Sequence, residues 1–331
     1  MHLQQLFAVL ILKLDTEMWS MFSWIINLIQ INMFILTCQK ASKLETRFDF
    51  YYKHYINFSA FFLWFKKLSL SFKNLDFTLI FNESCCLTNS WIIVFFYVDN
   101  IILIFCQHNI KKFEALKIHL FMKYEFHDQK ELRWFLNIQI IYNRQAQKLY
   151  FTQNIYIDKI IQWFDLQSAS HVYKFLFWNI LQFILYDKRA ILNEIQAYQK
   201  YINSLIYLTN ILHINIAHST SFLAQFMQNS FSIHAIKIDH LIIYLHNHKW
   251  LSLVMNDNTD LSNEFIKIFE NSNNASYSDN LITCQNSEKY IFYFFDCLID
   301  WWIIWQNTVM IFTTEAELLT LTHISKQIMW W

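Results

Sequence analysis

Three pairs of side chains in this sequence could bind a metal ion or transfer a proton, but their spacing does not suit that chemistry. Two histidines that bind one zinc ion from a helix stand four residues apart, and the first pair here stands five apart. The second pair could share an ion only on a strand, and the third has helical spacing in a segment that predicts a strand. We interpret all six as solvated or hydrogen-bonded side chains. The pairs are His213 and His218, His246 and His248, and Asp296 and Asp300.

A polar tip between two apolar runs is a stronger candidate for a functional site. The runs Trp91–Tyr97 and Ile101–Phe105 are rich in β-branched and aromatic residues, and only Val98, Asp99 and Asn100 separate them. This pattern predicts a β-hairpin. Asn suits such a turn because it adopts the left-handed backbone conformation more readily than other residues with a side chain.

The absence of two residue types limits the functions that the chain can have. A chain of this length contains roughly 23 glycines and about 17 prolines at average usage, whereas this one has Gly 0 and Pro 0. Dinucleotide-binding fingerprints, phosphate-binding glycine loops, collagen repeats, proline-rich linkers and the nucleophile elbow of hydrolases all need one of them. The sequence excludes these classes and leaves Asn as the nearest substitute for glycine at positive φ.

Charge and hydrophobicity indicate a poorly soluble chain without an electrostatic attraction to nucleic acid. Lys+Arg 26 balance Asp+Glu 26, while hydrophobic residues make up 55% and aromatic residues 19% of the chain. A neutral chain with surplus apolar surface tends to precipitate, and nucleic-acid binders normally carry a basic surface. The six cysteines include no Cys-x-x-Cys pair, so we expect reduced thiols in a cytoplasmic or nuclear protein.

One stretch raises the alternative of a non-enzymatic, hydrophobic, membrane-associated protein. Met18–Cys38 has no charged residue and is long enough to cross a bilayer. Three polar residues near its middle, Asn27, Gln30 and Asn32, would be costly inside a membrane. We therefore do not expect a membrane to be the partner.

Hydrophobic periodicity predicts both strands and helices along the rest of the chain. A second hairpin is expected from Trp134–Tyr142 and Lys148–Thr152, and a polar linker from Asn256 to Asn263. Two further strands are expected at Tyr290–Phe295 and Trp301–Trp305. The expected helices are Lys111–Tyr124, Ile155–Phe164, two or three pieces within Ala197–Trp250, and a last one from about Thr314 to the end.

The hairpin tip and its flanks resemble the polymerase region of copia-type retrotransposon polyproteins. The family's hairpin has an aromatic–aliphatic–acid–acid tip, which Tyr97-Val98-Asp99-Asn100 matches except at the last position. The resemblance runs in order, with nearly correct spacing, from about residue 60 to residue 331. Other matching segments are Leu63–Leu68, Phe72–Phe77, Cys85–Thr88, Glu131–Ile138, Phe151–Ile160, Tyr201–Leu208, His213–Ala217 and Ile243–Asn247, with Asp300–Trp301, Gln306–Val309 and Thr313–Leu319 in the RNase H part.

The resemblance implies an α+β fold with a reverse-transcriptase palm-like sheet, a helical thumb or connection region and a truncated RNase H-like segment. The implied activity is that of an RNA-directed DNA polymerase with RNase H, using Mg²⁺ and an RNA/DNA template-primer. The implied parts are an eroded N-terminal part of the reverse transcriptase at 1–59, the palm-like region at 60–170, the thumb or connection region at 171–255 and the partial RNase H-like region at 262–331.

The same resemblance implies the site residues. Asp99 matches the first carboxylate of the polymerase hairpin, and Asn100 stands where the second belongs. Glu317 matches a helix-borne carboxylate of RNase H, and Asn274 occupies the position of that site's first metal-binding aspartate. The implied catalytic residues are Asp99, Asn100 and Glu317, and the implied metal ligands are Asp99 and Glu317. Because two Mg²⁺ ions need several carboxylates, we expect metal binding and catalysis to be lost and template-primer binding to be weak or absent.

The departures from the family pattern have one direction. Glycine becomes Asn at Asn137, Asn203 and Asn247, proline becomes Ser or Phe, arginine becomes His, and aspartate becomes Asn. These are products of G→A and C→T transitions, so the chain looks like a hypermutated, pseudogene-like copy of a transposable element. If each of the three Asn residues keeps a positive φ, it costs roughly 1 kcal/mol of stability.

Overall fold

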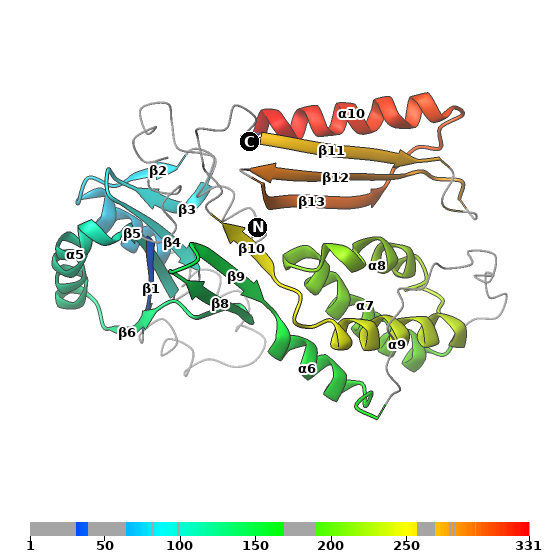
Figure 1. Cartoon of the computed structure of the whole chain (residues 1–331), viewed down its shortest axis with the longest axis horizontal. Helices are drawn as coiled ribbons and strands as arrows, with labels where there is room; N and C mark the ends of the chain where they lie inside the picture. Colours follow the sequence, from blue (N-terminus) through cyan, green and yellow to red (C-terminus); the bar gives the residue numbers. More distant parts are fainter. Residues whose placement is uncertain are drawn as a thin grey trace. The chain divides into compact units, whose positions relative to one another are not determined.

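The computed structural model describes residues 31–38, 64–80, 83–97, 100–168, 190–256, 269–277, 280, 283–294 and 296–330 (Figure 1). The chain divides into two compact units. The N-terminal unit holds the described residues of Val9–Arg133 and Asn143–Lys148, and the C-terminal unit holds those of Trp134–Tyr142 and Leu149–Trp331. Both units combine helices with antiparallel strands, which is compatible with the predicted α+β class.

One six-stranded antiparallel sheet organises the N-terminal unit. Its strands are β1 (Ile31–Cys38), β2 (Thr78–Ile80), β3 (Glu83–Thr88), β4 (Ile92–Tyr97), β5 (Asn100–Cys106) and β6 (Phe126–Glu131). They are arranged in the order β2-β3-β4-β5-β1-β6 (Figure 1). The inner strands β4 and β5 form the hairpin that the sequence predicts, with Ile93 opposite Ile104.

One face of this sheet packs on two helices, residues 64–73 and α5 (Ile110–Lys123). The helical period puts Phe113, Leu116 and Leu120 on one side of α5, and all three are buried. Aromatic rings fill much of this core. For example, Phe105 of β5 stacks on Phe113 of α5, with ring centroids 4.3 Å apart. The predicted helix in this part of the sequence is confirmed.

Strand β1 corrects the interpretation of Met18–Cys38 as a possible membrane span. Ile31–Cys38 is a strand between β5 and β6, and its residues Met33, Ile35 and Leu36 are buried. The earlier part of the stretch lies outside the described residues. In the part of the chain that the structure describes, no helix is both long and apolar enough to cross a membrane. The apolar character of Ile31–Cys38 reflects an inner strand buried on both faces, which periodicity alone does not distinguish from a helix.

Packed helices form a core in the C-terminal unit. They are α6 (Asn154–Trp163), α7 (Leu192–Ile211), α8 (Ala217–Ala224) and α9 (Ser232–Asn247). Their buried residues recur at helical spacing, as Tyr198, Ile202 and Leu205 do on α7. The helices predicted at Ile155–Phe164 and within Ala197–Trp250 are therefore confirmed.

The second predicted hairpin is present, but its first strand is broken. The strands of this sheet are β7 (Trp134–Phe135), β8 (Ile138–Asn143), β9 (Lys148–Thr152) and β10 (Leu253–Asn256), in the order β10-β9-β8-β7. Leu136 and Asn137 interrupt the expected single strand with φ values of 49° and 59°, and the chain turns back there to pair β7 with β8. Beyond Asn256, the predicted linker lies outside the described residues.

The three Asn residues at family glycine positions do not share one conformation. Asn137 has the positive φ that a glycine would adopt without strain. Asn203 and Asn247 instead lie in α7 and α9, where the backbone is right-handed helical. The expectation of strain is thus wrong at these two positions, because a helix requires no positive φ.

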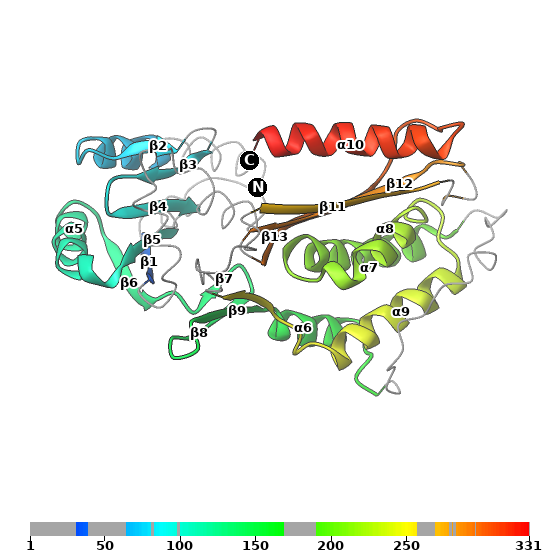
Figure 2. The ribbon, with the colours of Figure 1, turned by 45° about the horizontal axis from the view of Figure 1, so that its top comes forward.

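The C-terminal residues form a three-stranded antiparallel sheet covered on both faces by helices (Figure 2). Its elements are β11 (Phe269–Ser276), β12 (Ser287–Phe294), β13 (Cys297–Trp305) and α10 (Thr313–Trp330). Helix α10 lies along one face, while α7 and α8 lie on the other (Figures 1 and 2). On that second face, Trp301 Nε1 donates a 2.8 Å hydrogen bond to the carbonyl oxygen of Thr209. The two strands and the terminal helix predicted here are confirmed.

Candidate functional site

The first candidate site is the end of the β4–β5 hairpin. Tyr97 and Asn100 are opposite each other in the register, so only Val98 and Asp99 connect the two strands. Asp99 itself lies outside the described residues. Tyr97 is 39% exposed, whereas the five residues of β4 before it are buried. The hairpin therefore brings Asn100 to an exposed end of two otherwise apolar strands.

A row of paired residues crosses the sheet at this end. Asn100 pairs with Thr37 of β1, which in turn pairs with His127 of β6. Residues directly opposite each other on antiparallel strands lie on the same face of the sheet. Tyr97, Asn100, Thr37 and His127 thus share one row, and none of them is an acid. The adjoining strand β1 contains no Asp or Glu at all.

The acids on β6 are already paired with cations. Lys117 Nζ lies 2.6 Å from Asp128 Oδ2, and the backbone N–H of Lys130 donates to Asp128 Oδ1 at 2.7 Å. Burial acts to raise the pKa of Asp128, but these hydrogen bonds and the nearby lysine charges together lower it below its usual value. Glu131 Oε1 lies 2.6 Å from a guanidinium nitrogen of Arg144. Both carboxylates therefore stabilise β6 and its surroundings.

The residues paired in this row carry no carboxylate. The backbone register places Asn100, with its neutral amide, opposite Tyr97 on one side and Thr37 on the other. Mg²⁺ is a hard cation that prefers carboxylate and phosphate oxygens. The amide oxygen of Asn100 is therefore a weaker ligand for it than an Asp carboxylate at the same position.

The second candidate site lies between α10 and β11. Glu317 Oε1 accepts a 3.3 Å hydrogen bond from the backbone N–H of Ala275. Asn274, the residue before, is exposed, and its side chain lies on the opposite face of β11 from that of Ala275 because successive residues alternate. The structure brings the helix of Glu317 to the strand of Asn274. The Glu317 carboxylate contacts the strand through its backbone.

Glu315, two residues before Glu317, has a structural role. Its Oε2 accepts hydrogen bonds from the backbone N–H groups of Ile311 and Phe312, at 3.1 and 3.3 Å. A carboxylate at this position satisfies donors that precede the first turn and interacts favourably with the positive end of the helix. This carboxylate thus helps to fix where α10 begins.

Sequence reasoning missed a buried polar network beneath α10. We define it by five side chains from β12, β13, α10 and the turns beside them: Asn286, Glu288, Gln306, Thr320 and His323.

Within this polar network, Glu288 is 3% exposed, and His323 Nδ1 lies 2.8 Å from its Oε1. Gln306 Nε2 donates to the carbonyl oxygen of Ala316 at 2.9 Å and to Thr320 Oγ1 at 3.1 Å. Gln306 Oε1 accepts a 3.0 Å hydrogen bond from Asn286 Nδ2. One sequence signal could have revealed Glu288. Apolar residues alternate along β12 with a period of two, and this alternation puts the Glu288 side chain on the buried face of the strand.

The structure gives polar contacts for His246, His248 and Asp300, three of the six residues that we interpret as solvated or hydrogen-bonded. His213 is 2% exposed, and burial lowers its pKa to about 4. His246 Nε2 lies 3.3 Å from Asp158 Oδ1, and Asp300 Oδ2 accepts a 3.1 Å hydrogen bond from the Tyr290 hydroxyl. Across the described ranges, no group of three His, Cys, Asp or Glu side chains could hold a metal ion.

Comparison with known proteins finds a distant likeness. The chain is 22% identical over 280 residues to the "Retrovirus-related Pol polyprotein from transposon TNT 1-94" of Nicotiana tabacum. The matched region covers 81% of this chain but 20% of that polyprotein, so the chain spans about a fifth of its curated relative. No protein-family model matches the chain, and no solved structure matches it. The likeness supports an origin in a retrotransposon polyprotein.

Proposed function

We propose that the chain is a degenerate copy of the reverse transcriptase and RNase H part of a copia-type retrotransposon polyprotein, and that it catalyses neither reaction. The observation that carries this proposal is the hairpin of β4 and β5, in which Asn100 is paired with Tyr97 across the connection that contains Asp99. The family's polymerase motif needs such a hairpin within an antiparallel sheet. The likeness to a Pol polyprotein along 81% of the chain is consistent with the same origin.

In this proposal the six-stranded sheet derives from the palm, and α7 to α9 derive from the thumb or connection region. The sheet β11–β13 with α10 derives from the first part of RNase H. The proposed ranges are those given by the motifs, namely 1–59, 60–170, 171–255 and 262–331. Mg²⁺, an RNA/DNA template-primer and a cytoplasmic or nuclear location are the corresponding expectations for an active ancestor.

The proposed loss of polymerase activity follows from charge. In a two-metal mechanism, the ions stabilise the attacking 3′ oxygen and the leaving pyrophosphate, and negatively charged ligands hold the ions. Asn100 offers a neutral oxygen, and β1 beside it offers no acid. Removing one charged group from such a centre costs on the order of several kcal/mol, which is about a thousandfold or more in rate.

The RNase H part is proposed to be inactive for a related reason. Its helix carboxylate, Glu317, accepts a hydrogen bond from the Ala275 backbone, and the position of the first metal-binding acid holds the neutral Asn274. One carboxylate that is already hydrogen-bonded does not bind two cations strongly.

Primer extension by the full chain on a poly(rA) template tests the polymerase proposal. We expect no product above background with Mg²⁺ or Mn²⁺. Extension by the wild type that Asp99→Ala abolishes, while the distant control Glu114→Gln on α5 retains it, would disprove the proposed loss. Cleavage of an RNA/DNA hybrid that is abolished by Glu317→Gln would disprove it for the RNase H part.

A further inference from the structure

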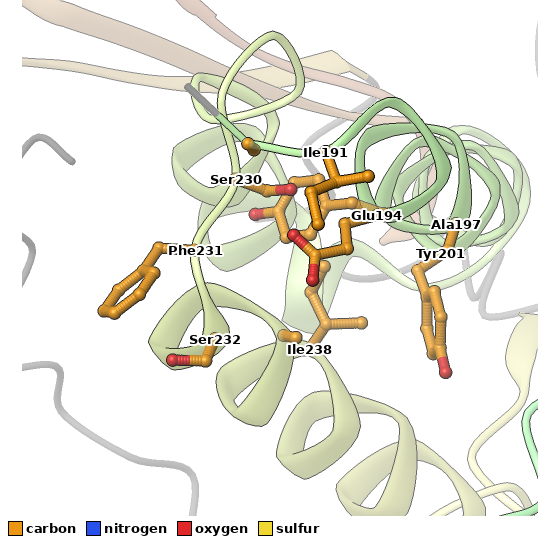
Figure 3. A pocket seen from close by; sticks show the side chains of 11 residues that line it. Ile191, Glu194, Ala197, Tyr201, Ser230, Phe231, Ser232 and Ile238 are labelled. Atoms are coloured by element: carbon orange, nitrogen blue, oxygen red, sulfur yellow. The ribbon is translucent and has the colours of Figure 1, made fainter. Parts of the chain in front are cut away.

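A cavity of about 450 Å³ lies between the N-terminal halves of α7 and α9, within the C-terminal unit (Figure 3). Cavities of this size accommodate small organic ligands. The walls are mostly apolar or aromatic, with two serine hydroxyl groups and one carboxylate. The lining residues are Ala190, Ile191, Glu194, Ala197, Tyr198, Tyr201, Ser230, Phe231, Ser232, Ala235 and Ile238.

Two of the aromatic walls are held in place before any ligand arrives. The Tyr198 hydroxyl donates a 2.8 Å hydrogen bond to the carbonyl oxygen of Leu223. The ring of Tyr201 stacks on Phe164, with centroids 3.6 Å apart and planes inclined by 16°. A site whose walls are already ordered loses little entropy on binding.

The electrostatics of the cavity favour a positively charged ligand. Among the lining residues that the structure describes, Glu194 is the one charged side chain, and none is Lys, Arg or His. Figure 3 shows Glu194 between Ile191 and Ile238, with Tyr201 on one side and Phe231 on the other.

A second acid adds to the negative potential of this region. Burial raises the pKa of Tyr201, and the negative charge of Asp239 raises it further. The N-terminal ends of α7 and α9 carry partial positive charges of about half a unit each, which offset part of the negative charge of Glu194 and Asp239.

We propose that this cavity binds a small organic cation, with an apolar or aromatic body against Tyr198, Tyr201 and Ile238 and an amine or amidine group at Glu194. Aromatic faces attract cations through their quadrupole, and a charge-assisted hydrogen bond to a carboxylate fixes the head group. The inference does not depend on the polymerase ancestry, because the cavity is lined by α7, α9 and the residues just before them, all in the C-terminal unit.

Three probes have nearly the same shape but differ in charge: cationic benzamidine, neutral benzamide and anionic benzoate. Comparing their affinities isolates the contribution of charge. Binding to the full chain is measured by saturation-transfer NMR titration. We expect saturable binding of benzamidine, weaker binding of benzamide and none of benzoate. Equal affinities for benzamidine and benzamide would overturn the cation assignment, and no saturable binding of any probe would overturn the site.

Variants on the two helices locate the site. Glu194→Gln should weaken benzamidine binding about tenfold and leave benzamide binding unchanged, because it removes one charge-assisted hydrogen bond. Ala235→Trp on α9 and Ala197→Trp on α7 should each fill the cavity and abolish binding of both probes. Glu114→Gln on α5 is the matched control and should change nothing. Benzamidine binding that survives Glu194→Gln and both Trp variants would disprove the proposal.

Discussion

The region around β5 and the region around β12 are both buried, but different forces hold them together. Around β5 the space is filled by apolar side chains, such as Phe105 stacked on Phe113. Around β12 the buried face carries Glu288, which is hydrogen-bonded to His323 of α10, and Gln306 extends the polar network to two further positions of α10. An apolar centre loses stability with the volume removed, whereas a polar network loses it with each partner removed.

The contrast extends to the two candidate sites. At the hairpin end the proposed ancestry implies a second acid, and the neutral Asn100 stands at that position. Beside β11 the acid is present as Glu317, but it is bound to a backbone N–H. A site can thus lack a free carboxylate either because a neutral residue replaces the acid or because the acid is hydrogen-bonded to another group. The sequence reveals the first case, and only a structure reveals the second.

The largest expected effect comes from removing apolar volume in the N-terminal unit. Phe105→Ala should destabilise the protein by about 4 kcal/mol, because it leaves a cavity beside Phe113. Urea unfolding of the full chain measures the loss. Met122→Ala, at a residue that is 81% exposed on α5, is the control and should change stability by less than about 0.5 kcal/mol. Similar values for the two variants would contradict the packed core.

Acid should loosen the C-terminal unit before the N-terminal unit. The folded unit holds His213 neutral with a pKa of about 4, while the unfolded chain protonates it near 6.5. The contribution of His213 to the stability of this unit is therefore fully present above pH 6.5. About 3 kcal/mol of it is lost as the pH drops towards 4. The lowered pKa of Asp128 in the N-terminal unit acts in another window, because its contribution is lost only below the ordinary value of 3.8.

Unfolding by urea at about pH 7, 5.5 and 4.5 checks this window. His213→Gln should lose less stability between pH 7 and 4.5 than the wild type does. The difference between the two proteins should be most of the contribution that we assign to His213. Profiles that stay parallel in wild type and variant would show that His213 is not the group responsible.

Breaking the polar network should cost about 2 kcal/mol. Gln306→Leu keeps a similar volume but removes the hydrogen bonds to Ala316, Thr320 and Asn286 in a buried setting. Hydrogen exchange should accelerate in α10 and leave α5 unchanged. Thr322→Ala on the exposed side of α10 is the control. Unchanged protection of α10 in Gln306→Leu would mean that packing alone holds the helix.

Restoring glycine should have opposite effects at two positions. Asn137→Gly should raise stability by about 0.5 kcal/mol because it relieves a positive φ. Asn203→Gly should lower stability by a few tenths of a kcal/mol because glycine disfavours the interior of α7. Changes of the same sign in thermal melts of the two variants would contradict the assigned backbone conformations.

The smallest effect is expected at the hairpin itself. Asn100→Asp adds one charge next to Asp99, but β1 and the facing His127 contribute no further carboxylate. We expect no measurable gain in Mg²⁺ binding by titration calorimetry. Clearly tighter binding in the variant, with an unchanged melt, would show that the single substitution had removed a competent site.

Local patterns explain why much of the fold could be predicted. The runs at Trp91–Tyr97 and Ile101–Phe105 alternate with polar turns at hairpin length, and α5 repeats its apolar residues at helical spacing. These signals depend on near neighbours in the sequence. Strand β1 was missed because an inner strand that is apolar on both faces has no alternation to reveal it.

The site could be predicted less well than the fold. Residue types alone indicated that Asn100 and Asn274 lack charge. They could not indicate that Glu317 reaches a backbone donor 42 residues away, or that Glu288 meets His323 across 35 residues. Such partners are set by how α10 packs on the sheet, which no local pattern encodes.

The bond from Ala275 to Glu317 also bears on self-association. Strand β11 is an outer strand of its described sheet, and its run Asn271-Ser272-Asn273-Asn274 is polar and uncharged. Outer strands of this composition are templates for pairing with other copies, and Asn-rich segments stack readily into cross-β fibrils. The Glu317 carboxylate occupies one backbone donor of β11 and places a negative charge beside it. A strand arriving from another copy would meet an occupied donor and a negative charge at Ala275, which disfavours edge-to-edge pairing at that position.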